Sequence, residues 1–258
     1  MTKLLEAISD PYERKARVVP GLIVTLPILV PLVCAYGAKN PMLTAVGALL
    51  GGSGAIYALA NVARGLGKRL EERLIDTWGA MPTTIVLRHR DSFLDSMTKA
   101  RYHDAIRRKL GIQMPTPDEE VANPAKADDA YLAATRRLRE LTRGNKGLLF
   151  TENIAYGFHR NMLAMKPIGI LTSVCGVLSG MLMAGVISMR KPFVNLINLH
   201  GIGLSAGLTL LVSFVLVATW LFYFNERAVR RIGFSYAERL FECLPILRKG
   251  VTVISARN

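Results

Sequence analysis

The stretch IGLSAGLTLLVSFVLVATWLFYF, Ile202–Phe224, contains no Asp, Glu, Lys, Arg or His. Three other runs, residues 18–38, 42–63 and 168–189, share this lack of ionisable side chains. Each run has 21 to 23 residues, and a helix of that length crosses the ~30 Å hydrocarbon core of a bilayer. A helix at the surface of a soluble protein would need charged residues on its exposed face. The four runs therefore predict four transmembrane helices.

The basic residues lie unevenly between these runs. The chain has 33 Lys+Arg and 19 Asp+Glu, for a net charge of +14. With four spans, 30 of the basic residues and all 19 acidic residues fall on one side of the membrane, and 3 basic residues on the other. Because Lys and Arg are retained on the cytoplasmic side, we expect both termini to be cytoplasmic.

The spans divide the chain into five segments. We expect an all-α membrane protein, with four transmembrane helices as two hairpins and a mostly helical cytoplasmic domain inserted between them. The segments are a cytoplasmic N-terminal segment (1–17), hairpin 1 (18–63), a cytoplasmic regulatory domain (64–167), hairpin 2 (168–224) and a cytoplasmic tail (225–258). Lys39-Asn40-Pro41 is the predicted turn of the first hairpin.

Local signals predict the elements of the cytoplasmic domain. A charged helix continues the second span through 66–78, and the β-branched run 83–87 favours a short strand or extended segment. Further helices are expected over 91–110, ended by Gly111, from Pro117, where acids follow in the first turn, and over 128–143.

Prolines and small residues mark the spans. Prolines inside a helix remove hydrogen bonds and kink it, whereas glycines four residues apart let helices approach closely. The candidate pore-lining or packing residues are Pro27, Pro31, Gly47, Gly51, Gly176, Gly180, Gly203 and Gly207. The hydroxyl residues of the spans either line a pore or bond to carbonyls of their own helices. They are Thr25, Ser53, Thr172, Ser173, Ser179, Ser205, Thr209 and Ser213.

The sequence shows no constellation for catalysis, a cofactor or a metal. The three cysteines and four histidines lack ligand spacing, and we expect Cys34, Cys175 and Cys243 to be reduced, packed thiols. His89-Arg90-Asp91 matches the catalytic-loop motif of kinases, but no glycine-rich loop, strand lysine or DFG accompanies it. We therefore expect a protein that is not an enzyme.

Basic residues of the cytoplasmic domain form clusters far from any span. The candidate ligand-binding residues are Arg88, Arg90, Arg107, Arg108, Arg136, Arg139 and Arg143. One interpretation is attraction to anionic lipid headgroups. The other is a site for a nucleotide or oligonucleotide, with Tyr102, Tyr131 or Tyr156 stacking on a base.

Three segments carry a resemblance to a known family: TENIAYGFHRNMLAMKPIGI (151–170), TTIVLRHRDSFLD (83–95) and MPTPDEEVANPAKADDAY (114–131). They resemble small bacterial membrane effectors of anti-phage defence operons, in particular the channel-forming effector of Hailong-type systems, over about residues 80–225. The resemblance implies a homo-oligomeric channel in the bacterial inner membrane. It also implies an oligonucleotide, made by a partner nucleotidyltransferase, that opens or closes the channel from the cytoplasmic domain. We take a tetramer as the working oligomer.

Two classes of function follow from the sequence. The first is an inner-membrane ion channel or pore effector that is gated by a nucleotide or oligonucleotide and acts by membrane depolarisation. The alternative is a non-conducting membrane scaffold whose basic domain recruits a protein partner or anionic lipid. A proton-coupled transporter is disfavoured, because the spans contain no ionisable residue that would mark a substrate or proton pathway.

Overall fold

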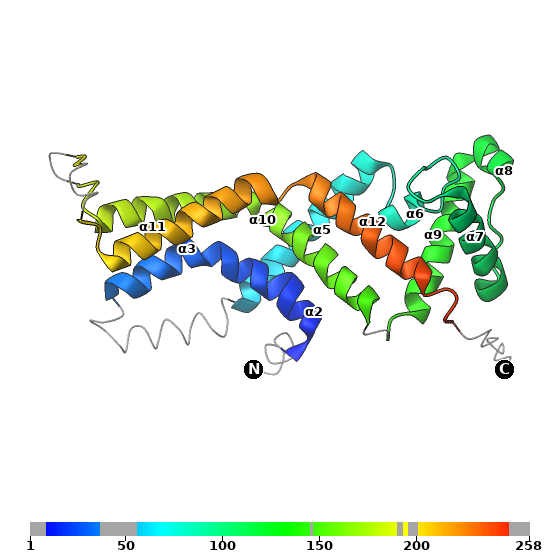
Figure 1. The fold of residues 1–258 in the computed structure, drawn as a ribbon, viewed down its shortest axis with the longest axis horizontal. Helices are drawn as coiled ribbons and strands as arrows, with labels where there is room; N and C mark the ends of the chain where they lie inside the picture. The colour runs from blue at the N-terminus through cyan, green and yellow to red at the C-terminus, as the bar shows by residue number, and fades with distance from the viewer. Residues whose placement is uncertain (1–8, 37–55, 145–146, 190–192, 196–200, 248–258) are drawn as a thin grey trace. The chain divides into compact units, whose positions relative to one another are not determined.

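A computed structural model describes residues 9–36, 56–144, 147–189, 193–195 and 201–247. The described residues are all-helical, with 79% of them in helices, and they form no strand beyond an isolated bridge between Ile187 and Val194. Figure 1 shows the helices in chain order. The expectation of an all-α protein is confirmed.

Three described helical segments are long and apolar enough to cross a membrane: Pro11–Ala35, Leu148–Met183 and Leu204–Tyr223. They contain most of the predicted first, third and fourth spans. Most of the predicted second span, with the Lys39-Asn40-Pro41 turn, lies outside the described residues, and its last part begins helix α5, Ile56–Trp78. The described helices therefore support a membrane protein with three candidate spans, and the layout of four spans in two hairpins stays a prediction.

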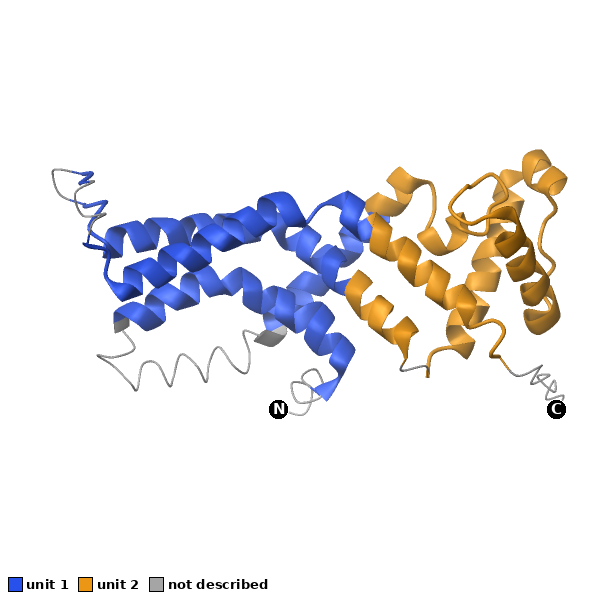
Figure 2. Cartoon of the chain, viewed as in Figure 1, with its two compact units in different colours: residues 1–72, 157–229 blue, residues 73–156, 230–258 orange. Residues whose placement is uncertain are grey.

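The chain divides into two compact units, coloured separately in Figure 2. Unit 1 contains residues 1–72 and 157–229, and unit 2 contains residues 73–156 and 230–258. Helices α5, α10 (Leu148–Met183) and α12 (Glu226–Glu242) each contribute residues to both units.

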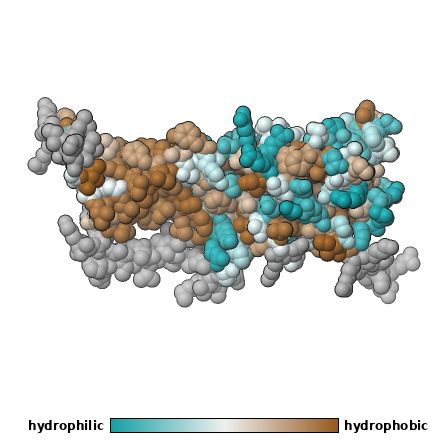
Figure 3. All heavy atoms as spheres, in the orientation of Figure 1, coloured by the Kyte–Doolittle hydropathy of each residue, from teal (hydrophilic) through white to brown (hydrophobic). Residues whose placement is uncertain are grey.

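Unit 1 contains two of the candidate spans and residues 157–183 of the third. Its N-terminal span consists of α2 (Pro11–Glu13), the π-helical η1 (Arg14–Val18) and α3 (Val19–Tyr36), and its last span of α11 (Leu204–Ala218) and the π-helical η4 (Thr219–Tyr223). Figure 3 shows apolar side chains gathered over α3, α10 and α11. Large apolar side chains are exposed on all three helices, including Leu32, Leu171 and Leu211. Such outward apolar faces suit contact with lipid tails rather than water.

Glycines set the inner packing of these helices. A Cβ on Gly169 would overlap the Trp220 ring, and one on Gly180 would lie 2.7 Å from Leu210 Cγ. Residue numbers rise along α10 as they fall along α11, so the two helices pack antiparallel. Trp220 and Met162 lie in the apolar core of this unit.

Unit 2 is built from short helices around its own apolar core. They are α6 (Pro82–Ile85), α7 (Ser96–Leu110), α8 (Pro117–Ala122) and α9 (Pro124–Leu141). The expected helices over this region are confirmed, although α7 begins at Ser96 rather than Asp91 and α9 spans 124–141 rather than 128–143. Gly111 ends α7 with a φ of 69°, a left-handed conformation that glycine adopts without steric cost. Thr116 and Glu119 form a capping box at α8.

One sequence-based prediction for unit 2 is wrong. Residues 83–87, expected as a strand or extended segment, continue from α6 into a helical turn, and all five are buried. Pro82 at the first helical position suits a helix start. The described residues of the unit provide no partner strand, so local helical hydrogen bonds satisfy this buried backbone, including Val86 N–H to the Pro82 carbonyl at 3.0 Å.

The predicted cytoplasmic tail supplies part of the same core. Phe234, Leu240 and Phe241 of α12 pack with residues of α7 and α9. The Phe241 ring lies 5.8 Å from the Tyr102 ring. Residues 230–247 are therefore structural members of unit 2, although more than seventy residues separate them from Tyr156 along the chain.

Candidate anion-binding site

The seven candidate arginines fall into two groups according to their partners. Arg88, Arg90, Arg107 and Arg108 each form an ion pair with an acidic side chain of the same unit. Arg136, Arg139 and Arg143 have no ion pair with any described residue, and all three are exposed. The second group has no acidic partner among the described residues to neutralise it.

Arg88 and Arg90 are neutralised by residues from α8 and α9. The buried Arg88 makes two hydrogen bonds to Asp128, from Nε at 2.8 Å and from Nη2 at 2.7 Å. Arg90 donates to Glu120 at 2.9 Å and is 3.2 Å from Asp128. Because both carboxylates are engaged and Glu120 is 2% exposed, this network joins helices rather than offering a cationic surface.

Glu120 is held as an anion in this network. Burial alone would raise its pKa, but hydrogen bonds from Tyr131 Oη and from the backbone N–H groups of His89 and Arg90 outweigh burial, so the pKa lies below the usual value. Tyr131 donates at 2.6 Å, and burial together with this bond raises the pKa of its hydroxyl. The predicted availability of Tyr131 for base stacking is wrong, because the ring is fully buried beside Glu120.

Arg107 and Arg108 are exposed but share one carboxylate. They lie 2.7 and 2.6 Å from the two oxygens of Asp104, one turn earlier in α7. Such exposed pairs within one helix contribute little to stability, but they reduce the local positive charge.

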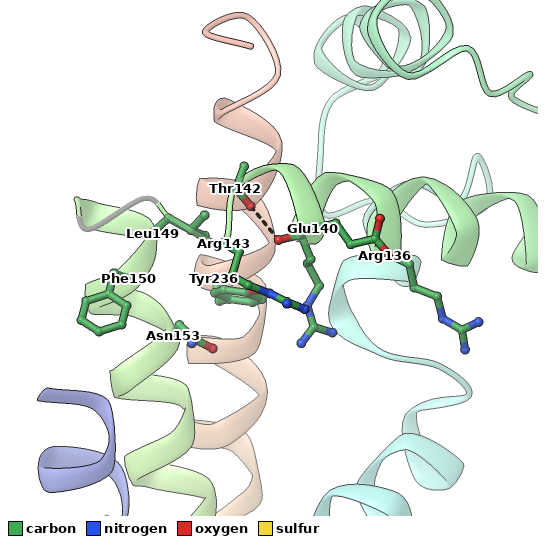
Figure 4. Close-up of a pocket in the computed structure, with 9 residues that line it drawn as sticks. Arg136, Glu140, Thr142, Arg143, Leu149, Phe150, Asn153 and Tyr236 are labelled. Atoms are coloured by element: carbon green, nitrogen blue, oxygen red, sulfur yellow. Dashed lines mark hydrogen bonds between the residues drawn. The ribbon is translucent and has the colours of Figure 1, made fainter. Parts of the chain in front are cut away.

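Arg136, Arg139 and Arg143 line a cavity of about 420 Å³ in unit 2. Arg136 and Arg139 lie three residues apart and share a face of α9, and Arg143 follows the C-terminal end of the helix. Figure 4 shows the Arg143 side chain extending beside Tyr236 of α12. Three arginines thus line one cavity from a single stretch of chain.

The remaining walls of the cavity come mainly from two other helices. Leu149, Phe150 and Asn153 are in the first turns of α10, and Tyr236 is on α12. Glu140 also lines the cavity, but its carboxylate is paired with Arg137 at 3.0 Å. The site therefore combines unpaired cations, one amide and aromatic rings.

The sequence identified the arginines of this cavity but not the aromatic residues that line it. Tyr102 and Tyr156, proposed for stacking, are 4% and 7% exposed, so their faces are unavailable to a ligand. The aromatic residues beside the arginines are Phe150 and Tyr236 instead. No local signal marks Tyr236, because only the fold brings α12 to α9.

The predicted pore-lining or packing residues occupy different environments. Gly176 and Gly180 face neighbouring helices closely, whereas a Cβ on Gly203 would meet no atom within 4 Å and one on Gly207 only Ile202 at 3.6 Å. Pro27 and Pro31 lie inside α3. Gly47 and Gly51 lie outside the described residues.

Comparisons of this chain with protein-family models, curated proteins and solved structures found no match.

Proposed function

We propose that the chain is a homo-oligomeric inner-membrane channel or pore effector of a bacterial anti-phage defence system, gated by a nucleotide or oligonucleotide in the arginine cavity. The observation that carries this proposal is the set of Arg136, Arg139 and Arg143, which have no acidic partner among the described residues and face one cavity. Guanidinium groups bind phosphate through charge-assisted, bidentate hydrogen bonds. Rings such as Phe150 and Tyr236 offer a surface for a nucleobase.

Helix α10 supports a link between ligand and membrane. It contains the cavity residues Leu149, Phe150 and Asn153 and, in the same uninterrupted 36-residue helix, the candidate span. At the helical rise this length is about 54 Å, well beyond the ~30 Å needed to cross the hydrocarbon core. A ligand that bridges α9 to the first turns of α10 would therefore bias a helix that enters the membrane.

The channel itself is supported by the uncharged spans and by the resemblance of residues 151–170 and their companion segments to channel-forming defence effectors. Opening such a channel would depolarise the inner membrane. Because one copy has few spans, we propose that the pore forms between copies, with a tetramer as the working number.

One observation favours the second candidate, a non-conducting scaffold that recruits a protein partner or anionic lipid. The outward faces of α3, α10 and α11 present large apolar side chains. Five of the hydroxyl groups considered for a pore bond instead to carbonyls of their own helices: Thr25, Thr172, Ser173, Ser179 and Thr209. These faces suit lipid or other apolar helices.

The test combines ligand binding with conductance of the full-length protein in planar bilayers. The probes are a short single-stranded oligodeoxynucleotide, ATP and inorganic phosphate. The variant Arg139→Ala/Arg143→Ala removes two unpaired cavity cations, and the matched control Arg107→Ala/Arg108→Ala removes two cations paired with Asp104. Each lost charge-assisted bond costs about 1.5–3 kcal/mol. The cavity variant should therefore weaken binding of at least one probe about tenfold or more, and the control should not.

Conductance separates the two candidates. The channel proposal expects that the probe which binds also changes the current, and that the cavity variant loses this response while the control keeps it. Bilayers without current under every probe would contradict the channel and favour the scaffold. Binding that both double variants weaken equally would contradict the cavity as the site.

A further inference from the structure

Two polar oxygen atoms lie inside the apolar packing of unit 1, where α3 and α11 pack against α10 at Gly176. The Ser213 Oγ atom and the Pro27 carbonyl oxygen both lie under 3.0 Å from the position that a Gly176 Cβ would occupy. Because both oxygens lie under 3.0 Å from the same position, they are less than 6.0 Å apart (twice 3.0 Å). Ser213 is 0% exposed, and Gly176 is the residue whose missing side chain admits both groups.

Each of the two oxygens lacks its ordinary partner. Ser213 Oγ is buried without a hydrogen-bond partner, unlike Ser173 Oγ, which donates to the Gly169 carbonyl at 2.6 Å. The Pro27 carbonyl would accept from residue 31 in an α-helix, but Pro31 has no N–H. A polar group left without a partner in a dry apolar interior is costly.

The same helix shows how a proline-freed carbonyl is satisfied elsewhere. Pro20 has no N–H for the carbonyl of Ala16. That carbonyl accepts instead from Asn161 Nδ2 of α10 at 2.6 Å, and Asn161 is 0% exposed. The fold thus supplies a side-chain amide at Ala16, whereas the facing group at Pro27 is a hydroxyl that does not reach it.

We propose that one water molecule binds at Gly176 and joins the Ser213 hydroxyl of α11 to the Pro27 carbonyl of α3. Two hydrogen bonds of about 2.8 Å each span up to about 5.6 Å between the outer oxygens, and the two oxygens at Gly176 lie within that reach of each other. Buried waters make two to four such bonds.

A metal cation fits the same point less well. Hard cations take six or more oxygen ligands, usually with carboxylates among them. Here two neutral oxygens meet, and α3 and α11 contain no acidic residue. The water site is independent of the arginine cavity, because none of its residues belongs to unit 2.

The experiment measures transfer of magnetisation from water to serine Cβ in the full-length protein in lipid bilayers by solid-state NMR. Ser213→Ala identifies the Ser213 signal, and Ser173 is the matched internal control, since it is equally buried and bonded to its own helix. We expect build-up at Ser213 several-fold faster than at Ser173. Equal build-up at the two serines would overturn the proposal.

Two proline variants test the carbonyl partner. Pro31→Ala returns an N–H to the Pro27 carbonyl and should lower the build-up at Ser213 toward the value of Ser173. Pro20→Ala is the control, because the carbonyl that it affects already accepts from Asn161, and it should leave Ser213 unchanged. Fast build-up that survives Pro31→Ala would show that the water does not depend on the Pro27 carbonyl and would overturn the bridge.

Discussion

At the scale of single residues, acidic neighbours determine which arginines of unit 2 can meet a ligand. Arg88 and Arg136 are both basic residues far from a span, yet Asp128 neutralises the first at 2.7 Å and no described residue pairs with the second. The number of arginines in unit 2 is therefore larger than the number without an acidic partner. The buried titratable groups of unit 2 should also make its stability depend on pH.

His103 provides a prediction for pH. Burial, together with the nearby His89 and Lys99, lowers its pKa to about 4, despite the hydrogen bond to the Leu87 carbonyl. The folded state thus favours the neutral ring, while the unfolded chain takes up a proton near the ordinary pKa of about 6.5. Stability contributed by the neutral ring is complete above pH 6.5 and is lost as the pH falls toward 4, by up to about 3 kcal/mol.

The measurement is denaturant unfolding in detergent across this pH range, followed by Trp78 fluorescence in a Trp220→Phe background. Trp78 contacts the core of unit 2. His103→Gln keeps a donor for the Leu87 carbonyl and does not titrate, so its stability should change less over the same range. An equal pH dependence in both proteins would contradict the assignment to His103.

At the scale of elements, glycine positions distinguish a tight helix contact from an open one. Gly169 lies against the fully buried Trp220, whereas Gly207 faces only Ile202 at 3.6 Å. The spacing of glycines in the sequence does not separate these two cases, because the facing residue comes from another helix.

The same change, glycine to alanine, is expected to have opposite effects on stability at Gly169 and at Gly207. Gly169→Ala would overpack the contact with Trp220 and destabilise unit 1 by about 1–3 kcal/mol. Gly207→Ala would add a methyl group where it fits, in a helix interior that favours Ala over Gly by about 1 kcal/mol, and should be neutral or stabilising. SDS titration followed by far-UV circular dichroism measures both, and equal shifts in the unfolding midpoint would refute this account of the contacts.

At the scale of the whole molecule, each compact unit is assembled from separated parts of the chain. Unit 2 needs α12, whose Leu240 and Phe241 are fully buried among residues of α7 and α9. A C-terminal segment that looks like a tail in the sequence is therefore part of the domain that holds the arginine cavity, and it provides Tyr236 to that cavity.

Truncation of Phe241 tests this dependence. Phe241→Ala should destabilise unit 2 by about 3–5 kcal/mol, as large aromatic truncations in a core do. Hydrogen exchange should then speed up in α7 and α9, although neither is near α12 in sequence. Arg231→Ala, at an exposed position of the same helix, should leave exchange unchanged; protection retained in Phe241→Ala would show that α12 is not needed for this core.

The sequence by itself determined the apolar helices and some helix ends, because span length, absence of charge and a terminating glycine such as Gly111 are properties of short stretches. The prediction of a strand or extended segment at residues 83–87 was wrong, because β-branched residues favour a strand only where a partner strand exists. Tertiary structure alone decided which arginines stay unpaired, which rings lie beside them and what the tail does. Those outcomes depend on contacts across 38 to 40 residues, such as Arg90 and Arg88 with Asp128, and on contacts across longer gaps that no local pattern records.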